Sequence, residues 1–291
     1  MSTASDLLRS LYTMAMMVEA RDAYTGGHLW RVSQLSRLLA ESMRLDAEQV
    51  ARIELGGFLH DLGKVGIPDA VLNKRDRLSE EEYAVIKTHP RVGADLLRGH
   101  PLAALALDAV LLHHETPDGR GYPHGLPGAE IPLVARIVGV ADAFDAMTST
   151  RPYRAGMPIA RALSIIEANL GSQFDIEVGR NLLQLGEGPA LAHIVGHSEA
   201  GIPLQVCKQC GPVIALPRRV GDGDEVYCPS CTMGYRVSRT GSHAALQATG
   251  NAQPVQARQP QADHDLIDDM VRAGYRALPQ PKRGLLARLL A

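Results

Sequence analysis

Apolar residues recur at helical spacing through the first two thirds of the chain, and this pattern constrains the fold more than any other feature. Between residues 5 and 187 the spacing is seen first at Leu7, Leu11, Met14 and Val18, and again at Val32, Leu35 and Leu39. No sustained alternation of apolar and polar residues, as expected for exposed strands, interrupts it. The sequence therefore predicts an all-α helical domain over residues 1–190.

The residue pattern changes near residue 202, where short β-prone segments (PLQVC, VIALP, EVYC and YRV) alternate with glycine and proline. We expect a connector at 191–205 and a small β module at 206–239. Residues 240–262 are rich in Ala, Gln, Gly and Pro and predict a disordered linker. Apolar residues in 263–291 indicate one short helix, followed by a basic, leucine-rich tail.

Composition excludes several classes of protein. The chain has 291 residues, is 45% hydrophobic and has a net charge of -2, so no global field favours nucleic acid. The N-terminus carries early charges and no signal-peptide core, and no apolar run reaches the roughly 20 residues that span a bilayer. We expect a cytoplasmic protein without a transmembrane segment, and cysteines confined to two CxxC pairs suit that reducing compartment.

The stretch LHDLGK at 59–64 places His60 and Asp61 side by side within apolar sequence. Burial of both polar side chains costs free energy unless another group compensates for the lost hydration. A bound metal ion would compensate for it. A core histidine beside a capping aspartate is the simpler explanation of one such pair. Five further imidazoles or carboxylates, however, are attached to apolar helical segments: His28, His89, His113, His114 and Asp142. Repeated burial costs make coincidence a poor explanation.

These ligand types restrict the metal. Imidazole and carboxylate without thiolate suit Fe, Mn or Zn, and seven ligands are too many for one tetrahedral ion but suit two bridged octahedral ions. Asp61 is the natural bridge. Two ions about 3.5 to 4 Å apart can activate a hydroxide and clamp the oxygens of an in-line phosphoryl displacement. The residues therefore predict phosphoester hydrolysis.

Several motifs occur together in order: HDLGKVGIP, LNK, HP, HHETPDGRGYPHGLPG, VADAFDAMTSTRPYR and GSQFDIEV. Over residues 10 to 187 the chain resembles the HD-GYP family of HD phosphohydrolases. Members are helical bundles with a two- or three-metal centre, usually iron, that hydrolyse cyclic di-GMP to pGpG and often to GMP. The resemblance implies metal ligation by the seven residues above, a contact of Lys64 with the scissile phosphate, and phosphate binding by Arg151 and Arg154.

The loop at Glu115 to Gly128, called the GYP loop below, is the recognition side of this predicted site. Its glycines permit unusual turns and its prolines stiffen it, so we expect Gly121, Tyr122 and Pro123 to meet substrate or a partner. His124 is interpreted as a loop residue without a role in the site. Some family members bind a third iron through a Glu one turn before the first histidine. Tyr24 occupies that position, which predicts two ions, Fe/Fe with Mn as the substitute.

The cysteines form a second predicted site. CKQC at Cys207 and Cys210 and CPSC at Cys228 and Cys231 are separated by 17 residues and flanked by β-prone pieces, which is typical of a zinc ribbon with one structural Zn. A dithiol redox pair is the alternative. His193 and His197 are spaced i, i+4, but a solvated helix face explains them better than a metal.

Three functions remain open from the sequence. The first is a metal-dependent cyclic di-GMP phosphodiesterase. The second is a catalytically weak cyclic dinucleotide receptor that acts through protein contacts of the GYP loop. The third is a nucleic-acid-associated protein directed by its zinc ribbon, which the balanced charges of that ribbon disfavour. Protein partners are expected at the GYP loop, the ribbon or the C-terminal tail, and a homodimer is compatible with the ribbon.

Overall fold

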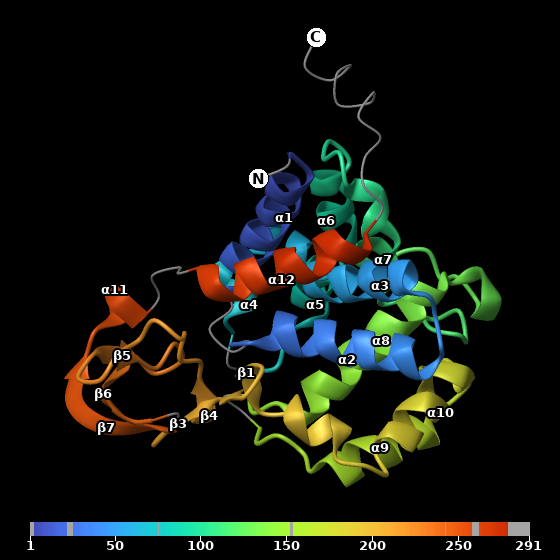
Figure 1. Cartoon of the computed structure of the whole chain (residues 1–291). Helices are drawn as coiled ribbons and strands as arrows, with labels where there is room; N and C mark the ends of the chain where they lie inside the picture. The colour runs from blue at the N-terminus through green and yellow to red at the C-terminus, as the bar shows by residue number, and fades with distance from the viewer. Residues whose placement is uncertain are drawn as a thin grey trace.

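Helices make up the described chain as far as residue 193, and a small β module follows (Figure 1). The computed structural model describes residues 3–21, 26–74, 76–151, 154–241, 243–257 and 262–278. The helices of the first part are α1 (Thr3–Glu19), α2 (His28–Ser42), α3 (Ala47–Leu59), α4 (Asp69–Leu72), α5 (Glu80–Ile86), α6 (His89–Leu97), α7 (Leu107–Leu112), α8 (Leu133–Thr148), α9 (Ile159–Ala168) and α10 (Ile176–Leu185). The predicted all-α domain is confirmed.

Short 3-10 turns connect these helices where the chain must turn tightly. They are η1 (Leu62–Gly66), η2 (Ala103–Leu105), η3 (Gly128–Glu130) and η4 (Ala190–His193). Local sequence sets several helix starts. Asp46 caps α3 and Ser79 caps α5, each in a capping box, and Asp175 caps α10. Pro132 and Pro158 directly precede α8 and α9.

The core of the helical part is formed where α2, α3 and α8 pack together. Leu35, Leu39 and Val32 are fully buried, as their spacing predicts. Tyr12 of α1 meets Phe58 of α3 edge to face, with ring centroids 4.9 Å apart. One expectation is wrong: Met14 is 39% exposed, because Leu8, Leu11 and Ala15 carry the buried face of α1 instead.

The β module spans residues 197–252, which is wider than the predicted 206–239, and contains three antiparallel sheets. Its strands are β1 (His197–Glu199), β2 (Ile202–Pro203), β3 (Gln205–Cys207), β4 (Gly211–Ile214), β5 (Glu225–Tyr227), β6 (Met233–Thr240) and β7 (His243–Ala252). Strand β1 pairs with β2, β3 with β4, and the third sheet has the order β5-β6-β7. In the third sheet Glu225 lies opposite Arg236 and Val237 opposite Leu246. The four β-prone pieces of the sequence all contribute to these strands.

The predicted disordered linker at 240–262 is wrong over most of its described length. Strand β7 pairs with β6 from Thr240 opposite His243 to Met233 opposite Ala252, and α11 (Pro254–Ala257) follows. Alternate residues of β7 are half-buried, among them Ala244, Leu246 and Ala248, which pack on the small core around Tyr235. Backbone pairing and small side chains are enough for this strand, so its low apolar content misled the sequence prediction.

The last described helix, α12 (His264–Ala277), returns from the β module and lies across the helical part, packed on α1 and α3 (Figure 1). Its apolar face is buried at Leu266, Ile267, Met270 and Val271, which confirms the predicted short helix. Arg9 of α1 pairs with Asp268 at its edge. The predicted basic tail at 282–291 lies outside the described residues. Among the described helices, none combines the length and the apolar character needed to cross a bilayer.

Candidate metal centre

Seven imidazole and carboxylate side chains from separate elements meet inside the helical part. His28 begins α2, His60 and Asp61 follow α3, His89 begins α6, His113 and His114 follow α7, and Asp142 lies in α8. Their potential ligand atoms form overlapping groups within 4.8 Å: His28, His60 and Asp142; His89, His113 and His114; and His60, Asp61 and His113. All seven predicted ligands are therefore brought together.

Asp61 lies between the two outer groups, with one carboxylate oxygen toward each. Its Oδ2 is 3.4 Å from Nε2 of His28 and 3.4 Å from Nε2 of His60. Its Oδ1 is 3.4 Å from Nε2 of His89. Neighbouring ligands of an octahedral ion with bonds of roughly 2.1 Å lie about 3 Å apart, so these separations are of the right size. A carboxylate placed in this way could supply one oxygen to each of two ions.

The outer ring nitrogens of the histidines are held by acceptors that fix which nitrogen carries the proton. Nδ1 of His60 donates to the carbonyl of Gly57 at 2.8 Å, and Nδ1 of His89 donates to that of Ile86 at 2.8 Å. His113 does the same to Ala109 at 3.0 Å. A carbonyl oxygen can only accept, so in the neutral rings the proton is on Nδ1 and the lone pair is on Nε2, facing the centre.

Two of these lone pairs face each other without a proton between them. Nε2 of His89 and Nε2 of His113 are 3.2 Å apart. Nε2 of His60 is buried and, within the described residues, has no hydrogen-bond partner. Burial lowers the pKa of His89 and of His113, and lowers that of His114 to about 3, so these rings are neutral at neutral pH. A cation bound among these rings would satisfy the Nε2 lone pairs, to which no group in the described part of the chain donates.

The aspartate one turn after Asp142 and an arginine support the ligand His28, and sequence reasoning assigned neither a role. Nδ1 of His28 is 2.8 Å from Oδ2 of Asp145, and Nε of Arg31 donates to Oδ1 of Asp145 at 2.6 Å. Arg31 and Asp145 are both buried, and together Arg31 and His28 hold the pKa of Asp145 far below its usual value despite that burial. The signal was present: Asp145 lies three residues after Asp142 on an apolar helix.

A glycine lets η1, the turn after His60 and Asp61, approach α6, which begins at His89. A Cβ on Gly63 would lie 1.8 Å from the carbonyl oxygen of His89 and 2.5 Å from the amide nitrogen of Gly93. Backbone atoms cannot move aside cheaply, so no larger residue fits. Gly63 thus fixes the separation of η1 from α6, and with it the distance between Asp61 and His89.

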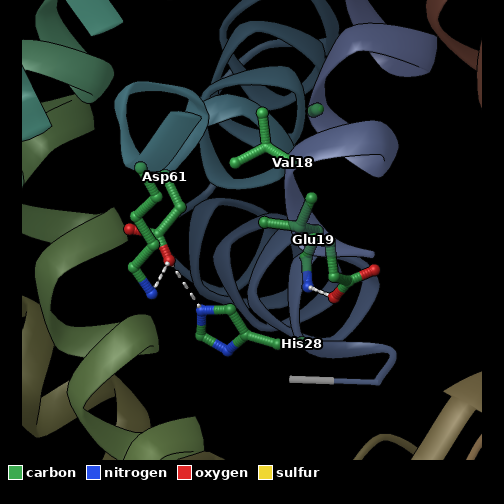
Figure 2. Close-up of a pocket in the computed structure, with 7 residues that line it drawn as sticks. Val18, Glu19, His28 and Asp61 are labelled. Carbon is green, nitrogen blue, oxygen red and sulfur yellow. Dashed lines mark hydrogen bonds and ion pairs between the residues drawn. The ribbon is translucent and has the colours of Figure 1, made fainter. Parts of the chain in front are cut away.

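Lys64 lies at the rim of the centre, beside Asp61. Its Nζ is 2.8 Å from Oδ2 of Asp61, and although burial opposes ionisation, Lys64 and the neighbouring histidines hold the pKa of Asp61 well below its usual range. Figure 2 shows His28 and Asp61 pointing toward each other across a small pocket of about 10 Å³, with Glu19 beside them. Glu19 accepts from the backbone N–H of Leu29 at 3.0 Å and so caps α2. Tyr24, from which two ions were predicted, lies outside the described residues.

The loop after His114 folds back against the ligands. The ring of Tyr122 stacks on His114, with centroids 4.6 Å apart, and its backbone N–H donates to the carbonyl of His114. The buried carboxylate of Glu115 accepts from the backbone N–H groups of His124 and Leu126 at 2.7 and 2.9 Å. The side chain of His124 is exposed, in line with its interpretation as a loop residue without a role in the site. Tyr122 therefore lies on the flank of a candidate ligand.

The two arginines of TSTRPYR lie just beyond the C-terminal end of α8. Arg151 and Arg154 pair through their backbones, and residues 152 and 153 between them are not described. The guanidinium of Arg154 donates to the carbonyls of Ala146 and Met147 at 2.5 and 3.2 Å. It thereby caps the helix that carries Asp142. Two bonds leave other guanidinium N–H groups available, so phosphate binding stays a prediction.

The four cysteines form a separate cluster in the β module. Their sulfur atoms lie within 4.8 Å of one another, and the Sγ atoms of Cys207 and Cys231 are 3.5 Å apart without a disulfide. Sulfurs bound at roughly 2.3 Å to one tetrahedral ion are about 3.7 Å apart, so the cluster fits zinc. The hydroxyl of Tyr235 donates to Sγ of Cys207 at 3.2 Å. Against the effect of burial, the bonds from Tyr235 and nearby backbone lower the pKa of Cys207 to about 7.

Charged groups of the β module are mostly bound within the chain. Arg218 bridges Glu199 of β1 and Asp269 of α12, at 2.5 and 2.8 Å. Arg236 pairs with Glu225, and Arg239 donates to the carbonyl of Val220. His193 and His197 do not share a helix, because η4 ends at His193 and β1 begins at His197. Their predicted helix face is therefore wrong, and neither joins a candidate metal group of the described residues.

Known proteins match the helical part of the chain. The HD domain family matches residues 12–178, more than half of the chain. The chain belongs to the HD domain family. This HD-domain chain is 45% identical over 168 residues to "Cyclic di-GMP phosphodiesterase response regulator RpfG" of Xanthomonas campestris, covering 57% of this chain and 44% of that protein. The predicted HD-GYP resemblance is confirmed.

Of two further relatives, one is named for cyclic di-GMP and the other for 3'3'-cGAMP. The HD-domain chain is 40% identical over 181 residues to "Cyclic di-GMP phosphodiesterase" of Thermotoga maritima, covering 62% of this chain and 49% of that protein. It is 40% identical over 162 residues to "3'3'-cGAMP-specific phosphodiesterase 3" of Vibrio cholerae, covering 55% and 35%. The chain therefore spans about half, or less, of the length of these relatives.

Proposed function

We propose that this HD-domain protein is a metal-dependent phosphodiesterase that hydrolyses cyclic di-GMP, or a closely similar cyclic dinucleotide, to pGpG, to GMP or to both. The single observation that supports this best is the position of Asp61, with each carboxylate oxygen facing a separate group of histidines. A full ligand set favours an enzyme over the alternative, a catalytically weak receptor. The relatives named above, phosphodiesterases of two cyclic dinucleotides, point to the substrate class.

The residues present fit two ions. His28, His60 and Asp142 would hold one, His89, His113 and His114 the other, and Asp61 would bridge them. When bound, the ions supply Lewis-acid polarisation of the phosphoryl oxygens and lower the pKa of an attacking water. Iron is the proposed metal, with manganese as the substitute.

The remaining site residues bind and orient the phosphates. Lys64, held beside Asp61, contacts the scissile phosphate as a point charge, and Arg151 and Arg154 hold the phosphates of the substrate at the end of α8. Tyr122 contacts substrate from the flank of His114. The positive charges of Lys64, Arg151 and Arg154 complement a dinucleotide with two phosphates.

Timed product analysis with metal-loaded protein and His60→Ala tests the function. Changing partners outside the ligand shell of metal sites costs 10- to 100-fold, so losing a ligand should lower turnover by at least about a hundredfold. His243→Ala, at an exposed position of β7, is the matched control and keeps full turnover. Turnover that survives His60→Ala would overturn the mechanism.

We propose that the four cysteines hold one structural zinc. Metal analysis after anaerobic purification should find two iron or manganese ions and one zinc per chain. Cys228→Ser should lose the zinc and retain the other two ions, whereas Ser238→Ala, at an exposed position of β6, retains all three. Three iron ions per chain, or zinc that persists in Cys228→Ser, would contradict the assignment.

We also propose that the β module contacts protein and not nucleic acid. Three of its arginines are already bound to acids or carbonyls of the chain: Arg218, Arg236 and Arg239. A second copy of the chain and a separate protein are both candidate partners, as they are for the GYP loop and the tail. Binding to DNA or RNA that weakens steeply with added salt would contradict this proposal.

A further inference from the structure

A second cavity opens beside the metal centre. Its volume is about 190 Å³, and its walls come from the segment after α7, from α8 and from the loop before α10. Three candidate ligands, His113, His114 and Asp142, line one part of it, and Val140, Ala143 and Phe174 supply apolar surface. For scale, an engineered cavity of roughly 150 Å³ accepts benzene. The space therefore suits a flat ring system attached to a phosphate on the metals.

The polar groups of this cavity gather around Arg136 of α8. Its Nη1 donates to Oδ2 of Asp175 at 2.8 Å, and that pair is mostly buried. Its Nε is buried and, among the residues that the structure describes, meets no acceptor. A buried guanidinium N–H without an acceptor costs free energy unless a ligand supplies one. Gln173, an exposed residue, and Thr116 also line the cavity and can donate or accept.

These groups match one nucleobase better than the others. Guanine presents O6 and N7 as two adjacent acceptors, which an arginine can bind with two N–H groups. Adenine presents an acceptor and an amino donor on the same edge, and a guanidinium cannot accept. The donors of guanine on its opposite edge can be met by the amide oxygen of Gln173.

The position along α8 links the base to the reaction. Arg136 precedes Asp142 by six residues, about 9 Å along the helix axis. Both lie on the same cavity, so one nucleotide can place its phosphate at the ligands and its base near Arg136. We propose that this cavity binds one guanine base of the cyclic dinucleotide, with Arg136 and Gln173 as specificity-determining residues. The inference rests on the proposed function and extends it from the metals to the base.

The test compares substrates with and without a base. Cyclic di-GMP, cyclic di-AMP and bis(4-nitrophenyl) phosphate are supplied to metal-loaded wild-type protein, Arg136→Lys, Arg136→Gln and Gln173→Ala. Arg136→Lys keeps a cation next to Asp175 but lacks the planar fork, and Gln173 is exposed, so folding is least at risk in these two. Arg180→Gln, at an exposed position of α10, is the matched control.

The readout is the ratio of kcat/KM for cyclic di-GMP to that for bis(4-nitrophenyl) phosphate. We expect Arg136→Lys and Arg136→Gln to lower it roughly tenfold or more, mainly through KM, and to reduce the preference over cyclic di-AMP. Gln173→Ala should lower it less, and Arg180→Gln should leave it unchanged. Wild-type turnover of cyclic di-GMP with unchanged ratios in Arg136→Lys and Gln173→Ala overturns the inference alone. Turnover of only the base-free diester by wild-type protein overturns the proposed function.

Discussion

His28 places one imidazole among three carboxylates, and this decides how the centre exchanges protons for metal. Its Nδ1 is 2.8 Å from Asp145, and its Nε2 is 3.4 Å from Asp61 and 3.5 Å from Asp142. Burial alone would lower the pKa of His28, but the hydrogen bonds to Asp145 and Asp61 outweigh it and raise the pKa to about 9. In the metal-free protein His28 is thus protonated at neutral pH, while His89, His113 and His114 are neutral.

With His28 as a ligand, as proposed, metal loading releases the proton of this ring. Because its pKa is raised, the proton is present below about pH 9 and competes with metal, so metal affinity should fall as pH falls from 9 and level off above it. At pH 7.5 we expect release of about one proton per chain from this group. Calorimetric titration of metal-free protein in buffers of different ionisation enthalpy measures it.

Asp145→Asn provides the comparison for that experiment. Without the carboxylate, the pKa of His28 is lower, so less proton is released. Above about pH 9, where no proton competes in either protein, metal affinity should fall by about 10- to 100-fold because the ring is held less firmly. Asp108→Asn, at an exposed position of α7, should match the wild-type protein. The same proton release from Asp145→Asn as from wild-type protein would contradict this account of His28.

At the scale of elements, the GYP loop approaches the segment from His114 to Thr116 most closely at Gly121. A Cβ on Gly121 would lie 2.4 Å from Cα of Glu115, 2.4 Å from the amide nitrogen of Thr116 and 2.5 Å from the carbonyl oxygen of His114. All three are backbone atoms. The loop must therefore move if residue 121 has a side chain, and the stacking of Tyr122 on His114 moves with it.

Gly121→Ala should consequently reduce both stability and turnover. Overpacking of this kind costs about 1–3 kcal/mol in the free energy of unfolding, which urea denaturation measures. Turnover should fall in fully folded protein, since His114 is displaced. Gly99→Ala is the matched control, because a Cβ there meets no atom within 4 Å. Wild-type turnover by Gly121→Ala would show that the loop position does not matter to the ligands.

At the scale of the whole molecule, the β module is joined to the helical part by buried polar contacts. Arg31, which holds Asp145, also donates to the carbonyl of His197 in β1 at 2.9 Å. Glu199 of the same strand is buried; burial raises its pKa, and Arg218 opposes that rise. Arg218 in turn reaches Asp269 of α12. Strand β1 is thereby linked both to Arg31, which holds the partner of His28, and to α12.

Arg218→Ala should lower the free energy of unfolding by about 1 kcal/mol. It leaves the carboxylate of Glu199 without its cation, but Arg218 is 43% exposed, so water screens part of the pair. Adding Glu199→Gln should recover part of the loss, because no buried charge then remains. Arg236→Ala, which breaks a more exposed pair with Glu225, should have almost no effect. Equal losses for Arg218→Ala and Arg236→Ala in urea titrations would count against a buried link.

The sequence by itself determined the helical part, the seven candidate ligands and the cysteine cluster. Helical periodicity is a local property, and the chemistry of imidazole, carboxylate and thiolate is carried by each residue wherever it lies. His28, His60 and Asp142 could thus be selected before their neighbours were known. The same reasoning failed for β7, whose few apolar side chains gave no periodic signal although its backbone pairs with β6, with one irregularity between Met233 and Tyr235.

Only the tertiary structure decided which groups complete one another. Residues far apart in the chain set three features: the support of His28 by Asp145 and Arg31, the division of the Asp61 oxygens between two groups, and the Nε of Arg136, which meets no acceptor in the described part of the chain. A buried polar group is stable only when its partner is positioned within hydrogen-bond distance, and folding alone sets that distance. For this reason the sequence identified the metal side of the site, and the structure identified the cavity beside it.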